Sequence, residues 1–85
     1  MKTKKDKEYS FNHFKERLKE RYGFDIERKE YNSLCSHIEY CALISIEKQK
    51  DDIQRIHDLG FRGVLVRVVW SEKRQCLTTA IPRGV

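Results

Sequence analysis

The stretch from Ile53 to Ile81, IQRIHDLGFRGVLVRVVWSEKRQCLTTAI, decides the fold of this chain. Residues 53–61 alternate with a period of two, which is the spacing of a strand whose two faces differ. Residues 64–70 (VLVRVVW) are mostly β-branched, and they are apolar on both faces apart from Arg67. A run that is apolar on both faces predicts a central strand, because both of its sides need cover.

Short polar segments separate these runs. Arg62-Gly63 predicts a tight turn, and residues 71–74 (SEKR) predict a polar hairpin loop. Residues 75–81 (QCLTTAI) form the last expected strand. Pro82 ends that strand because proline has no N–H to donate to the ladder. The whole stretch therefore predicts an antiparallel meander.

The pattern just before this meander leaves two interpretations open. Residues 48–52 (KQKDD) predict a polar turn. Residues 42–46 (ALISI) fit either a further strand or the end of a preceding helix. The sheet is therefore expected to have three or four strands.

Two helices are expected before the sheet. Ser10 is the expected N-cap of the first, and Gly23 ends it in a left-handed conformation. Its apolar face is Phe11, Phe14, Leu18 and Tyr22. Asp25 is the expected cap of the second helix. The apolar stripe of that helix is Tyr31, Leu34, Cys35 and Ile38. The predicted fold class is α+β, with both helices packed on one face of the sheet and the other face partly open.

The charge is concentrated at the two ends of the chain. The 85 residues carry a net charge of +5. Residues 1–30 hold ten Lys and Arg against seven Asp and Glu, and residues 61–85 hold five against one. We expect a single domain over residues 10–85, preceded by a flexible basic tail over residues 1–9. The basic surface favours RNA or another polyanion, or an acidic protein, as partner.

Composition also bears on compartment and cofactors. We expect a cytoplasmic protein, because no signal-peptide pattern is visible and no apolar run approaches the roughly 20 residues of a membrane span. The three cysteines are then expected to be reduced. Cys35, His37 and Cys41 are spaced C-x-H-x-x-x-C, which matches no common zinc motif. We therefore expect no metal and no other cofactor.

Polar residues that can carry chemistry are dispersed along the chain. His13 and Arg17 are one helical turn apart, so they project from the same side of the first helix. Arg55 and His57 share a strand face, and the pairing of consecutive strands places Arg67 beside them. Two arginines and a histidine on the open face of the sheet predict a phosphate-binding surface.

Each of these residues also has a structural interpretation. Arg67 can instead pair with Asp58 or Glu72 across the sheet. Thr78 and Thr79, expected on opposite faces of the last strand, are residue types that strands favour for their β-branching alone. The histidines can be ordinary polar residues of a helix and a strand. The sequence leaves these alternatives open.

The order of elements and two loose motifs resemble a known group. These motifs are His13-Phe14-x-x-Arg17-x-x-x-Arg21 and Leu77-Thr78-Thr79-Ala80-Ile81-Pro82. They resemble the barnase/colicin/RelE-like superfamily of small metal-independent ribonucleases, many of them toxins of bacteria and mobile elements. They also resemble uncharacterised phage-type proteins. The likeness covers roughly residues 10–82, and the chain lacks the catalytic Glu–His pair of that superfamily.

The resemblance implies attack of an RNA 2′-hydroxyl on the adjacent phosphorus. The expected catalytic residues are His13, His57, Arg67 and Thr79. The expected nucleic-acid-binding residues are Arg17, Arg55, Arg62, Lys73 and Arg74. It also implies the cytoplasm of a bacterium or of a phage-infected host cell as the place of action.

Two main functions follow from these observations. The first is a small basic binding protein of phage or mobile-element type, which engages nucleic acid or inhibits an acidic host protein. The alternative is a metal-independent ribonuclease toxin, restrained by an antitoxin. A small oligomeric structural protein is a third possibility, because residues 64–70 are apolar on both faces.

Overall fold

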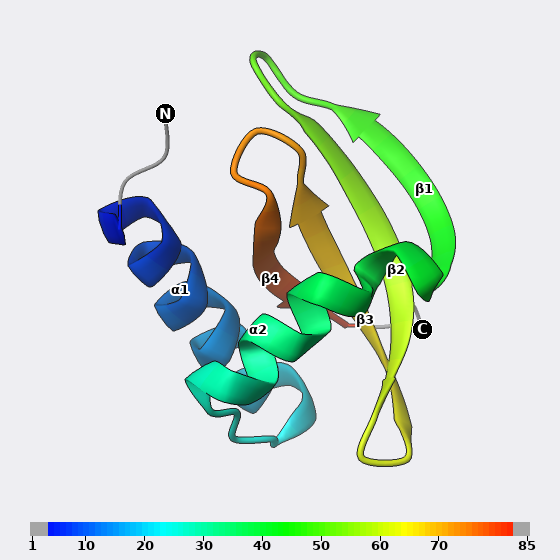
Figure 1. The fold of residues 1–85 in the computed structure, drawn as a ribbon. Helices are drawn as coiled ribbons and strands as arrows, with labels where there is room; N and C mark the ends of the chain where they lie inside the picture. The colour runs from blue at the N-terminus through cyan, green and yellow to red at the C-terminus, as the bar shows by residue number, and fades with distance from the viewer. Residues whose placement is uncertain (1–3, 83–85) are drawn as a thin grey trace.

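The computed structural model describes residues 4–82 and shows two helices followed by a four-stranded antiparallel sheet (Figure 1). The helical elements are α1 (Lys4–Tyr22), α2 (Arg28–His37) and the 3-10 turn η1 (Ile38–Tyr40). The strands are β1 (Ala42–Lys48), β2 (Ile53–Phe61), β3 (Val64–Ser71) and β4 (Cys76–Ile81). The strand order is β1-β2-β3-β4. The predicted α+β class is confirmed, as is the interior position of the VLVRVVW strand.

The predicted turn between β2 and β3 is confirmed by its backbone. Arg62 and Gly63 have φ angles of 52° and 80°. Positive φ at both central residues is what a two-residue hairpin turn of type I′ requires, and the twist of this turn matches that of the strands on either side. Gln75, at the end of the loop between β3 and β4, also has a positive φ of 55°.

The ambiguous segment 42–46 is part of a strand, β1, at the edge of the sheet. Its pairing with β2 shifts register between Leu43 and Ser45. Such a bulge adds a residue to one strand and increases its local twist. The four-stranded version of the sheet is therefore the one that forms.

The expected start of the first helix was wrong. Helix α1 begins at Lys4, so Ser10 lies inside the helix and is buried, with 1% of its surface exposed. The helix thus covers residues 4–9 of the segment expected to be a tail, and residues 1–3 lie outside the described residues. The physical reason is that Lys and Glu, which dominate this segment, have high helix propensity.

The end of α1 follows the prediction and the start of α2 does not. Gly23 has a φ of 76°, and its N–H donates to the Lys19 carbonyl at 2.9 Å. This is the expected left-handed helix end. The N-cap of α2 is Glu27 rather than Asp25, because Glu27 and Glu30 form a reciprocal capping box.

Both helices contribute to a single core with the sheet. Buried helical and interhelical residues are Phe14, Leu18, Ile26 and Tyr31, and their partners from the sheet include Leu59, Val66, Val68, Leu77 and Ala80. Two tyrosines fasten the helices to β4: the Tyr31 hydroxyl donates to the Leu77 carbonyl at 2.6 Å, and the Tyr22 hydroxyl donates to the Ile81 carbonyl at 2.7 Å. Helix α1 consequently packs along β4, and the N-terminal half of α1 is positioned beside the final strand (Figure 1).

Candidate functional site

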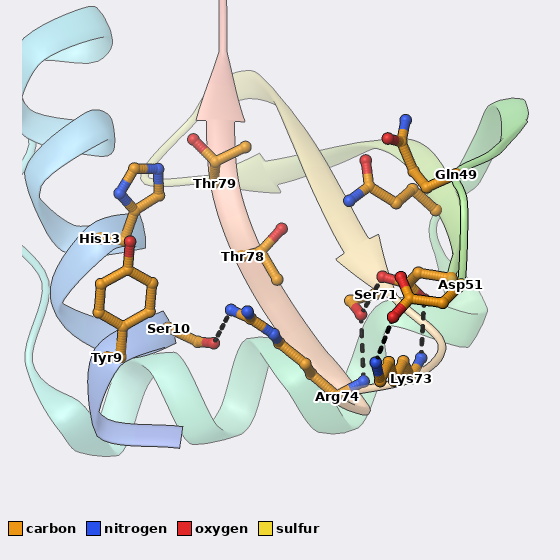
Figure 2. Close-up of a pocket in the computed structure, with 12 residues that line it drawn as sticks. Tyr9, Ser10, His13, Gln49, Asp51, Ser71, Lys73, Arg74, Thr78 and Thr79 are labelled. Atoms are coloured by element: carbon orange, nitrogen blue, oxygen red, sulfur yellow. Dashed lines mark hydrogen bonds and ion pairs between the residues drawn. The ribbon is translucent and has the colours of Figure 1, made fainter. Parts of the chain in front are cut away.

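A polar cleft of about 750 Å³ lies between the N-terminal half of α1, the end of the sheet and two of its loops (Figure 2). We call it the polar cleft. Its lining residues are Tyr9, Ser10, His13, Gln49, Asp51, Asp52, Gln54, Ser71, Lys73, Arg74, Thr78 and Thr79. Four of the residues expected at the site meet here, namely His13, Lys73, Arg74 and Thr79. The packing of α1 on β4 is what brings them together.

A β-bulge places two hydroxyl groups in the cleft. The register between β3 and β4 pairs Val69 with Thr79 and Trp70 with Leu77, so Thr78 is the extra residue. The prediction that Thr78 and Thr79 lie on opposite faces assumed a regular strand and was wrong, because both line the cleft. Figure 2 shows both side chains on the cleft side of β4.

Arg74 crosses the floor of the cleft from the loop between β3 and β4 (Figure 2). Its Nη1 atom lies 3.4 Å from the Ser10 hydroxyl oxygen, and its guanidinium carbon lies 5.8 Å from the centre of the Tyr9 ring. Arg74 is half-buried, and within residues 4–82 it makes no ion pair. A guanidinium held in this way presents N–H donors to an incoming anion.

Tyr9 and His13 form an aromatic pair on the α1 wall of the cleft. They are one helical turn apart, with ring centres 6.1 Å apart and ring planes 17° from parallel. Tyr9 is 62% exposed, whereas His13 is half-buried. Tyr9 is thus an accessible aromatic surface flanked by His13 and the Arg74 guanidinium.

The two aspartates of the cleft are occupied by neighbouring donors. Asp52 accepts hydrogen bonds from the Ser71 hydroxyl at 2.6 Å and from the amides of Ile53 and Lys73 at 2.7 and 2.9 Å. Burial alone raises the pKa of Asp52, but these hydrogen bonds outweigh burial and lower it. Asp51 is paired with Lys73 at 2.7 Å, and this contact lowers the pKa of Asp51 and raises that of Lys73. Both carboxylates therefore hold the loop between β1 and β2 against the loop between β3 and β4.

The other cations expected at the site lie elsewhere and are paired with carboxylates. Arg67 makes two hydrogen bonds to Asp58, at 2.9 and 3.2 Å, which confirms one of its structural alternatives. The remaining pairs are Arg55–Glu72, Arg62–Glu30 and Arg17–Glu20. The Arg62 guanidinium also lies 4.8 Å from the centre of the Phe61 ring. These four arginines are absent from the polar cleft.

His57 does not lie on an open face. It is only 3% exposed, its Nδ1 atom lies 3.2 Å from the Cys41 carbonyl oxygen, and its Nε2 atom is buried with no hydrogen-bond partner in residues 4–82. The predicted cluster of Arg55, His57 and Arg67 was wrong. The register pairs His57 with Val68 and Arg67 with Asp58, so Arg67 and His57 lie on opposite faces of the sheet.

Several cleft residues were missed by sequence reasoning. Tyr9 was assigned to a tail, although it stands four residues before His13, a spacing that a longer helix would have made informative. Gln54 and Ser71 pair across β2 and β3, but neither residue type marks a site by itself. The cleft is built from segments that are remote in sequence, so no local signal identified it.

Within residues 4–82, no group of three or more His, Cys, Asp or Glu side chains is placed to hold a metal ion. None of the helices in the same residues is long and apolar enough to span a membrane. The polar groups that line the cleft are hydroxyl, amide, imidazole, carboxylate, ammonium and guanidinium groups.

No protein-family model, curated protein or solved structure matches this chain.

Proposed function

We propose that the polar cleft binds single-stranded RNA through its phosphate groups and at least one base. The observation that carries this proposal is Arg74, a half-buried guanidinium in the cleft with no ion pair in the described part of the chain. Arginine recognises phosphate through paired N–H donors, and the strength of such contacts is greater where water is partly excluded.

Other groups of the cleft complement a phosphate at Arg74. The hydroxyls of Thr78 and Thr79 donate to the Val69 and Ala80 carbonyls, each at 3.4 Å, and a phosphate would receive these donors in place of those long contacts. His13 supplies a ring N–H from the opposite wall. The carboxylates of Asp51 and Asp52 repel a bound phosphate less than two free carboxylates would. Lys73 forms an ion pair with Asp51, and three hydrogen-bond donors surround Asp52. The binding region is thus the part of the cleft nearest α1 and β4.

The exposed ring of Tyr9 favours single-stranded RNA over duplex RNA as the ligand of the cleft. Its ring is largely exposed at the cleft and stands beside the Arg74 guanidinium. Bases of a single strand are free to stack on an aromatic side chain, whereas those of a duplex are already stacked on each other. A phosphate on Arg74 with its neighbouring base on Tyr9 therefore fits the arrangement.

The decisive experiment measures the affinity for a labelled single-stranded RNA of about 12 nucleotides by fluorescence anisotropy. Arg74→Ala is expected to weaken binding about tenfold or more, since a charge-assisted contact to phosphate is lost. Arg21→Ala is the matched control: it removes the same charge from an exposed position in the last turn of α1, two turns beyond His13.

The wild-type affinity is also expected to fall steeply as salt rises, because phosphate contacts release counterions. Equal losses in the Arg21 and Arg74 variants would indicate a diffuse charge effect and contradict the cleft. Absence of RNA binding by the folded wild-type protein would refute the proposal and favour an acidic protein as partner.

Metal-independent RNA cleavage is a second candidate, favoured by the presence of His13 and Thr79 in the same cleft as Arg74. His13 would accept the proton of the attacking 2′-hydroxyl, and Arg74 would stabilise the negative charge that develops on the non-bridging phosphoryl oxygens. The P–O5′ bond would break, the leaving O5′ would take a proton from water, and His13 would return its proton to the solvent. The products would be a 2′,3′-cyclic phosphate and a free 5′-hydroxyl.

This candidate is tested by incubating the protein with RNA in the presence of a chelator. Cleavage is expected to stop when the 2′-hydroxyl is removed from the substrate and when His13 is replaced in His13→Ala. If RNA is bound but remains intact after prolonged incubation, the protein binds without cutting.

A further inference from the structure

Two cysteines from different elements meet at a second cleft, away from the polar cleft. Cys35 belongs to the last turn of α2 and is half-buried, and Cys76 begins β4 and is 4% exposed. Both line a hollow of about 450 Å³ together with Tyr31 and Trp70. A small oxidant in this hollow would therefore meet both thiols.

A hydrogen bond fixes the position of Cys35 relative to Cys76. The amide N–H of Leu77 donates to the Cys35 sulfur, with the nitrogen 3.5 Å from Sγ. This amide nitrogen is bonded to the carbonyl carbon of Cys76, so the Cys35 sulfur lies directly beside the Cys76 backbone. The two cysteine residues are therefore neighbours in space, which a disulfide between them requires.

Tyr31 gives a second, independent indication that the thiols are neighbours. Its buried hydroxyl donates to the Leu77 carbonyl at 2.6 Å. Burial raises the pKa of Tyr31 far above its ordinary value, and the adjacent Cys35 and Cys76 thiols raise it further. Both thiols thus lie near the same phenolic oxygen, although the two cysteines are 41 residues apart in the sequence.

Cys41 differs from this pair in its surroundings. It follows η1, outside the hollow, and its thiol donates to the His37 carbonyl at 3.5 Å. Burial raises the pKa of the Cys41 thiol. Unlike Cys35 and Cys76, Cys41 shares no hollow with a second cysteine in the described residues. Cys41 is therefore an internal control for reactivity.

We propose that Cys35 and Cys76 are a redox-active pair that hydrogen peroxide converts into an intramolecular disulfide. Cys35 is the attacking group because it is the more exposed of the two, and the Leu77 N–H donates to its sulfur. This modification site does not depend on the proposed RNA binding.

The reaction proceeds in two balanced steps. The Cys35 thiolate attacks one oxygen of the peroxide, the O–O bond breaks, and the protonated leaving oxygen departs as water, which leaves a sulfenic acid on Cys35. The Cys76 sulfur then attacks the Cys35 sulfur, the S–O bond breaks, and the hydroxyl leaves as water with the Cys76 proton. The two thiols are oxidised, and one peroxide is reduced to two waters.

The disulfide would link α2 to β4. It would close a covalent loop in the chain, and that loop contains β1, β2 and β3. Cross-linking residues so far apart in sequence restricts the unfolded chain more than the folded one. The oxidised protein is therefore expected to unfold at a higher denaturant concentration than the reduced protein.

The test treats the full chain with hydrogen peroxide, alkylates the remaining thiols after denaturation, and maps the products by mass spectrometry. We expect alkylation of Cys41 alone, a peptide pair joined through Cys35 and Cys76, and recovery of all three thiols after dithiothreitol. The mapping uses the wild-type protein, so it does not depend on whether a cysteine variant folds.

Matched variants sharpen the assignment. Cys41→Ser is expected to form the same cross-link, whereas Cys35→Ser is expected to abolish it. Alkylation of all three cysteines after treatment, a bridge through Cys41, a bridge between two molecules, or oxidation of Cys35 without a bridge would each overturn the proposal.

Discussion

Arg67 and Arg74 are the same residue type in two different environments of this small fold. Arg67, on the interior strand β3, holds Asp58 through two hydrogen bonds, and the Asp58 contact raises its pKa. Arg74, in the loop that leads to β4, crosses the polar cleft and has no ion pair among the described residues. One guanidinium completes the fold, and the other is available to an anion.

The difference teaches that pairing, rather than charge count, locates a candidate site. The strands β2 and β3 and the turn between them contain Arg55, Arg62 and Arg67, and each has a carboxylate partner. A charge that is already paired offers little to a ligand, because a new contact would have to replace an existing one. The polar cleft is thus the better candidate, although it contains fewer arginines.

The largest expected effect concerns stability. Arg67→Ala leaves the Asp58 carboxylate, which is 9% exposed, without its guanidinium. This is expected to lower the free energy of unfolding, because two charge-assisted hydrogen bonds to a nearly buried carboxylate are lost. Urea denaturation followed by circular dichroism measures the loss. The RNA affinity of the folded Arg67→Ala protein should be unchanged. A tenfold loss of affinity in this variant would mean that Arg67 contributes to binding as Arg74 does.

Tyr9 provides the next test, on the cleft side of the comparison. Tyr9→Ala is expected to weaken binding of single-stranded RNA about fivefold, the loss of roughly 1 kcal/mol of base stacking. Tyr9→Phe should retain the affinity because it keeps the ring. Fluorescence anisotropy measures both variants, and an unchanged affinity in Tyr9→Ala would show that the cleft binds phosphate without stacking a base.

The smallest expected effect is a pH dependence that comes from the cleft loops. The hydrogen bonds to Asp52 lower its pKa in the folded protein below the ordinary value of 3.8. The stabilisation from Asp52 is therefore fully present above about pH 3.8 and is lost as the pH falls through the lower folded pKa.

The stabilisation that is lost when Asp52 is protonated is expected to be below about 1 kcal/mol, because the loop between β1 and β2 is close to solvent. Urea titrations between neutral pH and the acid range measure it, with Asp52→Asn as the comparison. The difference in stability between the two proteins should shrink at acid pH. A constant difference would mean that the Asp52 charge contributes nothing to the loops.

Much of the architecture was predictable because it depends on local spacing. The stripe of Phe14, Leu18 and Tyr22 and the left-handed Gly23 predicted most of α1, and the β-branched run at 64–70 predicted the interior strand. Periodicity of this kind is set by the geometry of helix and strand, so it can be read without knowing any partner. The start of α1 was missed because charged residues give no apolar stripe.

The site depended on relations that the sequence does not contain. Strand register put Arg67 against Asp58 and buried His57, while a one-residue bulge turned Thr78 and Thr79 to the same side. The packing of α1 along β4 then brought His13 across from them. The sequence by itself thus determined the helices, the turns and the interior strand, because these follow from neighbours along the chain. Only the tertiary structure decided which cations are paired and which face a cleft, because that choice depends on contacts between residues far apart in the sequence.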